Sequence, residues 1–396
     1  MDSTEQSKSR SFQTDSLRDG QNAYAFALAH ILHLSAKTGK KVLDICPTPD
    51  SWQAIDGETQ SSLIRILRDK TNEILSLNWD KVLEAALDHI ETYTRTGIES
   101  ISIQDPRYPQ LLRLIDDPPL VLFVKGSLRA CNELPGVAII GTRNMTSSGE
   151  RVASKIASSF GEKGFSIISG LAKGIDSAAH RGAVDMGLPT VAVFATALDK
   201  VYPAENRPLA NKILATGGAW VSELPTFKAA HRNSFVERDR IQSGLSSAVI
   251  PVQTDVKGGT MHTVSFAEKQ DRLLLCPCPI QLESGREQYR GITMLIDSGR
   301  ATGFTMKDYP DLILRIMKHF DDLKERAAKR FSGPKEDAVV NGSQNVLVFD
   351  SKSSDSSAPI LPESYALEEV RRAVRGLSRD RFDAIVRSLT AELFDN

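Results

Sequence analysis

The middle of the chain alternates short apolar runs with stretches whose apolar residues recur at helical spacing. Short apolar runs, most of them rich in valine and isoleucine, predict strands at residues 137–140, 166–168, 190–194, 219–222, 248–252 and 273–275. Helical periodicity predicts helices at residues 150–162, 175–186, 206–215, 235–245 and 261–269, and two more at 287–297 and 309–320. Strands that are apolar throughout are buried on both faces. The pattern therefore indicates an α/β fold, with a parallel sheet covered by helices on both faces.

The flanks of this region follow other patterns. Residues 1–20 are polar and are predicted to be disordered. Residues 21–97 carry apolar residues at helical spacing and predict a small helical domain, whose first helix is expected at 22–36 with Gly39 as its stop signal. The remaining assignments are extended segments at 101–103 and 120–124, the α/β domain at 98–325, a flexible polar linker at 326–362 and a short helical module at 363–396.

Composition narrows the possible functions. The chain has 396 residues with 49 basic and 50 acidic side chains, a formal net charge of −1, so any basic surface must be local. No long uninterrupted apolar span occurs, which argues against secretion and membrane insertion and favours a cytoplasmic protein. Cys46, Cys131, Cys276 and Cys278 are scattered and form no disulfide framework. Cys276-Pro-Cys278 lacks a second ligand pair, so we interpret it as a strand end, and we expect neither a metal nor a cofactor.

Four loops carry the candidate chemistry. They read Gly141-Thr-Arg143, Ser169-Gly-Leu-Ala-Lys-Gly174, Arg238-Asp-Arg240, and Gly258-Gly-Thr260 running on to Thr263. Where a strand gives way to a helix, backbone N–H groups point outward and the helix dipole favours negative charge. We therefore predict a groove for more than one phosphate, contacted by Gly141, Arg143, Ser169, Gly170, Lys173, Arg238, Arg240, Gly258, Gly259, Thr260 and Thr263. On a helix, Arg238 and Arg240 cannot share one face, although both are expected to border the groove.

Three residues beside these loops have other interpretations. Asp176 and His180 lie four residues apart on one face of the helix predicted at 175–186. We interpret them as holding the preceding loop in shape, because no serine or cysteine nucleophile with a matching base accompanies them. Phe235 stands beside the arginines, either as a stacking platform for a base or as a core residue. Gly141-Thr-Arg143, taken alone, also fits a structural turn with a solvated arginine.

Residues from about 94 to 297 resemble the DNA-processing protein A family (DprA, also called Smf). The matching segments are 105–112, 118–126, 137–143, 169–180, 202–203, 222–223, 238–246 and 258–260. The resemblance implies an extended Rossmann-like domain that binds single-stranded DNA, commonly as a homodimer, after a small helical domain. It also implies protection of single strands and their delivery to a RecA-type recombinase.

Two features depart from the family pattern. Asp239 stands between two arginines where the family usually has asparagine, and it weakens a phosphate site unless it turns to brace one of them. Segment 363–396 is too short for the winged-helix module with which many members end. These departures leave open a second hypothesis, a sensor or antitoxin-type regulatory subunit of a phage-defence system with an operon-encoded partner protein.

A third hypothesis is a nucleotide-binding enzyme similar to the phosphoribohydrolases. Those Rossmann-like enzymes use the motif Gly-Gly-x-Gly-Thr-x-x-Glu, whose carboxylate assists glycosidic cleavage. When the motif is laid over Gly258-Gly259, its acid falls on Ser265. Because that acid is missing, we expect a binding protein rather than an enzyme.

Overall fold

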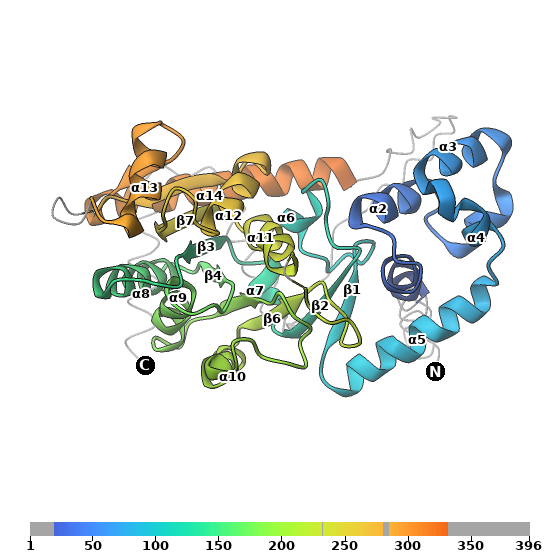
Figure 1. Ribbon diagram of the computed structural model, residues 1–396, viewed down its shortest axis with the longest axis horizontal. Helices are drawn as coiled ribbons and strands as arrows, with labels where there is room; N and C mark the ends of the chain where they lie inside the picture. Colours follow the sequence, from blue (N-terminus) through green and yellow to red (C-terminus); the bar gives the residue numbers. More distant parts are fainter. Residues whose placement is uncertain (1–19, 232, 280–284, 332–396) are drawn as a thin grey trace, which may run out of the picture. The chain divides into compact units, whose positions relative to one another are not determined.

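A nine-stranded sheet organises the protein (Figure 1), with the strand order β1-β2-β6-β5-β4-β3-β7-β8-β9. This computed structural model describes residues 20–231, 233–279 and 285–331. The strands are β1 (Glu99–Ser102), β2 (Val121–Gly126), β3 (Gly136–Gly141), β4 (Ser166–Ser169), β5 (Thr190–Val193), β6 (Ala219–Ser222), β7 (Ala248–Gln253), β8 (Leu273–Pro277) and β9 (Thr302–Phe304). Strands β3 to β9 pair in parallel, whereas β2 pairs antiparallel with both β1 and β6. Our assignments for residues 1–19 and 332–396 lie outside the described residues.

Helices connect and cover the parallel strands. They are α8 (Ser147–Gly161), α9 (Ile175–Val184), α10 (Arg207–Ala215), α11 (Ser234–Gly244), α12 (Thr260–Lys269), α13 (Glu287–Asp297) and α14 (Tyr309–Phe331). In the view of Figure 1, α8, α9 and α10 lie below the sheet, and α12 and α13 lie above it. Along β3, Val137 and Ile139 pack with α8 and α9, whereas Ala138 and Ile140 join the core that contains α11 and α12. This alternation confirms the predicted sheet with helices on both faces.

The sequence pattern misses two features of the carboxyl-terminal part. Helix α14 continues to Phe331, past the predicted start of the linker at 326, because Leu323 and Ala327 are buried on one of its faces. Leu323 packs there with Leu111 of α6 (Gln110–Arg113). Strand β9 has only three residues, and its central glycine interrupts any apolar run, so periodicity does not reveal it.

A helical region precedes the sheet. Residues 20–26 are helical and continue as η1 (Ala27–Ile31), followed by α2 (Ala36–Ile45), η2 (Pro49–Ala54), α3 (Gly57–Leu67), η3 (Arg68–Lys70), α4 (Thr71–Leu75) and α5 (Trp79–Arg95). The predicted stop at Gly39 is wrong, because Gly39 lies inside α2, where a Cβ would collide with Leu120. The first helix ends instead before Ser35, whose side chain accepts the Thr38 N–H and caps α2.

The hydrophobic core is continuous between the helical region and the sheet. Phe26 packs edge-on against Phe123 of β2, with ring centroids 6.2 Å apart. The side-chain oxygen of Asn22 accepts the Ser102 N–H at 2.9 Å. Buried side chains of both regions belong to one hydrophobic cluster. The core therefore does not divide at residue 97, where the sequence suggested a domain boundary.

The described residues also bear on membrane and metal binding. Within residues 20–231, 233–279 and 285–331, no helix is long and apolar enough to cross a membrane. The four cysteines are free, and Cys276 lies in β8, as expected of a strand end. In that same part of the chain, His, Cys, Asp and Glu side chains form no group of three that suits a metal ion.

Candidate functional site

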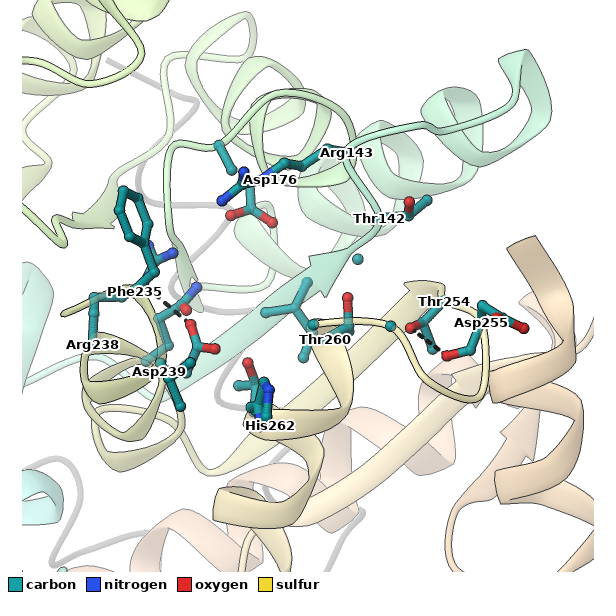
Figure 2. A pocket seen from close by; sticks show the side chains of 18 residues that line it. Thr142, Arg143, Asp176, Phe235, Arg238, Asp239, Thr254, Asp255, Thr260 and His262 are labelled. Atoms are coloured by element: carbon teal, nitrogen blue, oxygen red, sulfur yellow. Dashed lines mark hydrogen bonds and ion pairs between the residues drawn. The ribbon is translucent and has the colours of Figure 1, made fainter. Parts of the chain in front are cut away.

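The carboxyl ends of β3 and β7 border a cavity of about 450 Å³ (Figure 2). The strand order reverses at β3, since β4, β5 and β6 lie on one side of it and β7, β8 and β9 on the other. Loops that leave neighbouring strands diverge at such a point, and open α/β sheets bind ligands in the resulting crevice. The cavity therefore lies where this fold class forms its binding sites.

Two glycines hold the loops after β3 and β4 together. A Cβ on Gly141 would lie 2.6 Å from Cγ1 of Ile175 and 2.9 Å from the Gln253 carbonyl oxygen. Gly174 has a φ of +80°, which favours glycine, and its missing side chain lets the Ile175 N–H reach the Thr142 carbonyl at 3.2 Å. Gly141 therefore allows a close approach of backbone, as predicted, but the groups it approaches are Ile175 and Gln253 of the protein itself.

Ser169 lies inside the fold rather than in the cavity. It is fully buried, and its hydroxyl donates to the Ile139 carbonyl at 2.6 Å. The hydroxyl therefore fastens β4 to β3, which explains why a polar residue ends a buried strand. The geometry does not support the direct phosphate contact that the sequence suggested for Ser169.

The loop after Ser169 is braced from several sides. Leu171 adopts a φ of +58°, and its carbonyl accepts the side-chain N–H of Asn206 at 2.8 Å. The Gly170 N–H donates to Asp176 Oδ2 at 3.1 Å. Lys173, at the tip of the loop, is exposed and pairs with Glu205 at 2.6 Å. The loop is thus rigid at its base and presents a cation at its tip.

Asp176 and His180 stabilise neighbouring elements rather than each other. Burial raises the pKa of Asp176 to about 6, against the opposing effect of nearby Arg238. Burial lowers the pKa of His180 to about 3, and its Nδ1 lies 2.8 Å from the Thr190 hydroxyl of β5. Asp176 holds the Gly170 backbone, while His180 links α9 to the next strand.

The two arginines of α11 lie on different sides of the helix. Arg238 lines the cavity, with Nη1 donating to the Val193 carbonyl at 2.6 Å and Nε donating to Asp239 at 3.2 Å. Arg240 does not line it; this buried side chain forms ion pairs with Glu223 at 2.8 Å and with Asp117 at 3.1 Å. Residues two apart on a helix point about 200° apart, so Arg240 points away from the cavity and into the protein. The expectation that both arginines border the groove is therefore not met by Arg240.

Asp239 braces Arg238, one of the two arrangements that the sequence leaves open. Burial raises the pKa of Asp239, and the positive charge of Arg238 opposes this rise. The Thr263 hydroxyl hydrogen-bonds the same carboxylate, and Thr263 itself is buried. Thr263 thus lines the cavity mainly as a partner of Asp239.

The loop before α12 forms the side of the cavity opposite Arg143 and Asp176, as Figure 2 shows for Thr260 and His262. A Cβ on Gly258 would lie 2.5 Å from the Thr254 hydroxyl oxygen, so the turn is tight. The first N–H groups of a helix have no partner within it, and α12 begins at Thr260 beside Gly259. The N–H groups of Gly258, Met261 and His262 already donate to backbone carbonyls, so the predicted anion site is reduced to the backbone at Gly259 and Thr260.

Arg143 stands at the rim with an aromatic neighbour. It is exposed and makes no ion pair with any residue in the described ranges. Its guanidinium carbon lies 5.7 Å from the centroid of Phe235, whose ring packs edge-on against Tyr202 at 5.6 Å. A second, shallow cavity of about 70 Å³ lies between these aromatic rings and Lys173. Phe235 therefore lines the surface of the site rather than the core.

Sequence reasoning misses several residues that shape the site. The Gln253 side chain at the end of β7 clamps Thr146, the cap of α8, through bonds of 3.0 and 2.7 Å. Asn206 supports the Leu171 carbonyl, and Tyr202 forms one wall of the shallow cavity. The sequence signal for such residues is a polar side chain at the end of an apolar strand or just before a helix. This signal does not show which group the side chain contacts.

A parallel sheet whose glycine loops meet at the strand-order reversal, beside a guanidinium that makes no ion pair with any described residue, defines an α/β domain of the Rossmann-like class. The family model of DNA recombination-mediator protein A matches residues 99–313. The chain belongs to this family, as the sequence resemblance suggested.

Individual relatives agree. Protein Smf of Synechocystis is 38% identical over 186 residues, 46% of this chain and 46% of that protein. DNA processing protein DprA of Bacillus subtilis is 37% identical over 183 residues, 46% of this chain and 61% of that protein. The solved structure of DNA processing protein A from Streptococcus pneumoniae is 28% identical, covers 72% of this chain and 94% of that one, and gives a TM-score of 0.55. The chain spans about half the length of the curated relatives it matches.

Proposed function

We propose that this protein binds single-stranded DNA during recombination, along the loops at the carboxyl edge of its sheet. One observation carries the proposal: the loops after β3, β4 and β7 converge on one cavity, with the exposed Arg143, which makes no ion pair with any described residue, at its rim. Backbone N–H groups and a guanidinium recognise phosphate whatever the base. Membership of a family of DNA recombination mediators supports the same role.

The proposed phosphate contacts fall into two kinds. Arg143, Lys173 and Arg238 supply charge, with Arg238 using the N–H groups that Val193 and Asp239 leave free. The second kind is close backbone approach, proposed for Gly141, Gly259 and Thr260. Gly170 is buried beneath Arg238 and its N–H donates to Asp176, and the Gly258 N–H donates to the Asp255 carbonyl, so these two glycines shape the loops instead. Ser169, Thr263 and Arg240 contribute indirectly, since their polar groups are engaged within the protein.

The aromatic side chains favour single strands over duplex. Phe235 and Tyr202 line the shallow cavity next to Arg143 and Lys173, so a base stacks there while its phosphates meet the cations. Only an unpaired strand exposes both faces of its bases, and such stacking tolerates any sequence. We therefore expect little overall sequence preference.

The decisive experiment compares two arginine variants that lose the same charge. Arg143→Ala removes the rim cation; Arg129→Ala removes an exposed arginine of α7 (Leu128–Asn132), the helix before the amino end of β3. Fluorescence anisotropy with a labelled thymidine oligonucleotide gives the affinity at several salt concentrations. Arg143→Ala should weaken binding and lower the slope of log affinity against log salt by about 0.7, the loss of one phosphate contact. Arg129→Ala should match the unaltered protein, and equal behaviour of the two variants would refute the site.

We further propose that the protein acts as a homodimer that delivers single strands to a RecA-type recombinase. The family description as a recombination mediator supports this role. The test measures recombinase filament formation on strands already coated by a single-strand-binding protein. The unaltered protein should speed filament formation and Arg143→Ala should not; no acceleration by the unaltered protein would rule the role out.

We propose binding rather than catalysis. Ser265, where the hydrolase motif would carry its acid, is an exposed residue of α12. Incubation with nucleoside monophosphates should therefore release no free base, and release of base would reverse this assignment.

A further inference from the structure

One residue of β7 holds both ends of the loop that carries Arg143. This Arg143 loop comprises residues 142–146, between β3 and α8. The Gln253 carbonyl accepts the Thr142 N–H at 2.8 Å. The side-chain oxygen of Gln253 accepts the Thr146 N–H at 3.0 Å, and its side-chain nitrogen donates to the Thr146 hydroxyl at 2.7 Å. Hydrogen bonds of Gln253 therefore fix the two points between which the Arg143 backbone lies.

An irregularity in the sheet brings Gln253 to this position. Gly141 of β3 pairs with Gln253, whereas the residue before Gly141 pairs with Pro251, so Val252 is an extra residue on β7. Such a bulge redirects the side chain beside it, and bulges are common next to functional sites. Val252 packs in the core that contains α8, and the Gln253 amide bonds the cap of the same helix, although strict alternation would send it to the opposite face. The bulge thus turns the amide towards the Arg143 loop.

Gly149 leaves the space in which the Gln253 amide lies. Gly149 is a buried residue in the first turn of α8, and a Cβ there would collide with the amide of Gln253. The Gly149 N–H donates to the Thr146 hydroxyl at 3.0 Å, and the same hydroxyl accepts from Gln253. The end of β7, the Arg143 loop and the first turn of α8 are therefore joined through one amide.

Gln253 is placed to act on Arg143 and not on a ligand. It is fully buried and does not line the main cavity. Arg143 is exposed at the rim and makes no ion pair with any described residue. In Figure 2 its side chain extends from the loop on the side away from Thr142. Because no ion pair to a described residue holds the guanidinium, its location depends on the backbone that Gln253 fixes.

We propose that Gln253 is a positioning residue for DNA binding, which holds the Arg143 backbone where the guanidinium meets a phosphate of the strand. This inference rests on the proposed single-stranded DNA binding. A mobile loop has to be ordered when the strand arrives, and this ordering lowers the affinity, whereas a loop ordered in advance avoids that cost. Contacting groups are held most accurately when buried hydrogen bonds support them from behind. Because the amide acts only through Arg143, its loss should matter only while Arg143 is present.

A double-mutant cycle tests this dependence. Gln253→Met keeps the length of the side chain and removes both amide hydrogen bonds. Fluorescence anisotropy gives the affinity for a labelled thymidine oligonucleotide in the unaltered protein, in Gln253→Met, in Arg143→Ala and in the double variant. Gln253→Met should weaken binding by about five-fold or more in the unaltered protein. It should weaken binding by less than about two-fold when residue 143 is already alanine, because the two changes then act on the same contact.

Two further variants separate positioning from a general loss of stability. Asn132→Leu, in α7, removes an amide that accepts the Gln110 N–H at 3.1 Å, away from the cavity. It should lower the melting temperature and leave the affinity unchanged. Gly149→Ala keeps Gln253, but the added Cβ pushes the end of this flexible side chain aside. It should repeat the cycle, with a loss only while Arg143 is present, and it decides the question if Gln253→Met does not fold.

The outcomes distinguish the positioning role from the proposed function. Equal losses with and without Arg143, or no loss in the unaltered protein, would overturn the positioning role and leave DNA binding intact. A loss of affinity in Asn132→Leu as large as that in Gln253→Met would also overturn it, because any destabilisation would then have the same effect. If the unaltered protein binds no strand, or if Arg143→Ala binds as tightly as the unaltered protein, both proposals fail.

Discussion

Asp176 ties the stability of the protein to pH. Its carboxylate is buried beneath the loop after β4, accepts the Gly170 N–H at 3.1 Å, and has a pKa raised by burial from 3.8 to about 6. The folded protein therefore holds the Asp176 proton more tightly than the unfolded chain does. Its contribution to stability is complete below about pH 4 and is lost as pH rises through about 6.

The size of this effect follows from the same values. A shift from 3.8 to about 6 is about two pKa units, and each unit corresponds to about 1.4 kcal/mol. The free energy of unfolding should thus lose about 3 kcal/mol through Asp176 between pH 4 and pH 7.5. Asp176→Asn cannot titrate, and its amide oxygen still accepts the Gly170 N–H, so this variant should escape the loss.

Urea denaturation followed by tryptophan fluorescence at several pH values measures the effect. The stability of the unaltered protein minus that of Asp176→Asn should fall by about 3 kcal/mol from pH 4 to pH 7.5. Asp88→Asn, which changes an exposed residue of α5, serves as the control and should run parallel to the unaltered protein. Parallel curves for the unaltered protein and Asp176→Asn would refute the reasoning.

Because a phosphate in the cavity favours the neutral carboxyl, affinity for single strands should also rise from pH 7.5 to pH 5.5 in the unaltered protein more than in Asp176→Asn.

Two further substitutions test the framework of the site. Arg240→Met leaves Glu223 and Asp117 without their cation, so unfolding in urea should show a loss of about 3 kcal/mol. The folded variant should bind DNA more weakly, because α11 is no longer fastened, but with an unchanged slope of log affinity against log salt; a lower slope would mean that Arg240 contacts the strand. The added Cβ of Gly174→Ala meets a backbone carbonyl at a φ of +80°, so this variant should weaken both stability and DNA binding. Gly164→Ala, with a φ of +83° in open space, should lower the free energy of unfolding by only about 1 kcal/mol. Equal effects of the two alanines would show that the loop contact at Gly174 is unimportant.

The parallel strands were predictable because their physical signal is local. Strands β3 to β8 are short, mostly apolar runs bounded by helices, and their predicted and observed ranges differ by two residues at most, whereas the three-residue β9 was missed. The role of Gly39 was predicted wrongly because it depends on a contact that is not local. Its role is a close approach to Leu120, far along the chain, and a glycine that permits packing reads the same in sequence as one that ends a helix.

The site was predictable in its loops but not in its side-chain directions. The glycine turns that converge on the cavity follow from strands ending at one edge of the sheet. The inward turn of Ser169 and the ion pairs of Arg240 depend on Ile139, Glu223 and Asp117, which adjoin them only in the folded protein.

The ion pairs of Arg240 have a consequence for the entropy of DNA binding. They fasten one side of α11 to Glu223 and Asp117, so the helix cannot turn about its axis without breaking buried contacts. Arg238, on the other side, is consequently desolvated and aimed before any strand arrives. An incoming strand therefore has to immobilise only the exposed cations, Arg143 and Lys173. The rotamer freedom of Arg238 is already lost when the chain folds, so it adds nothing to the entropic cost of binding.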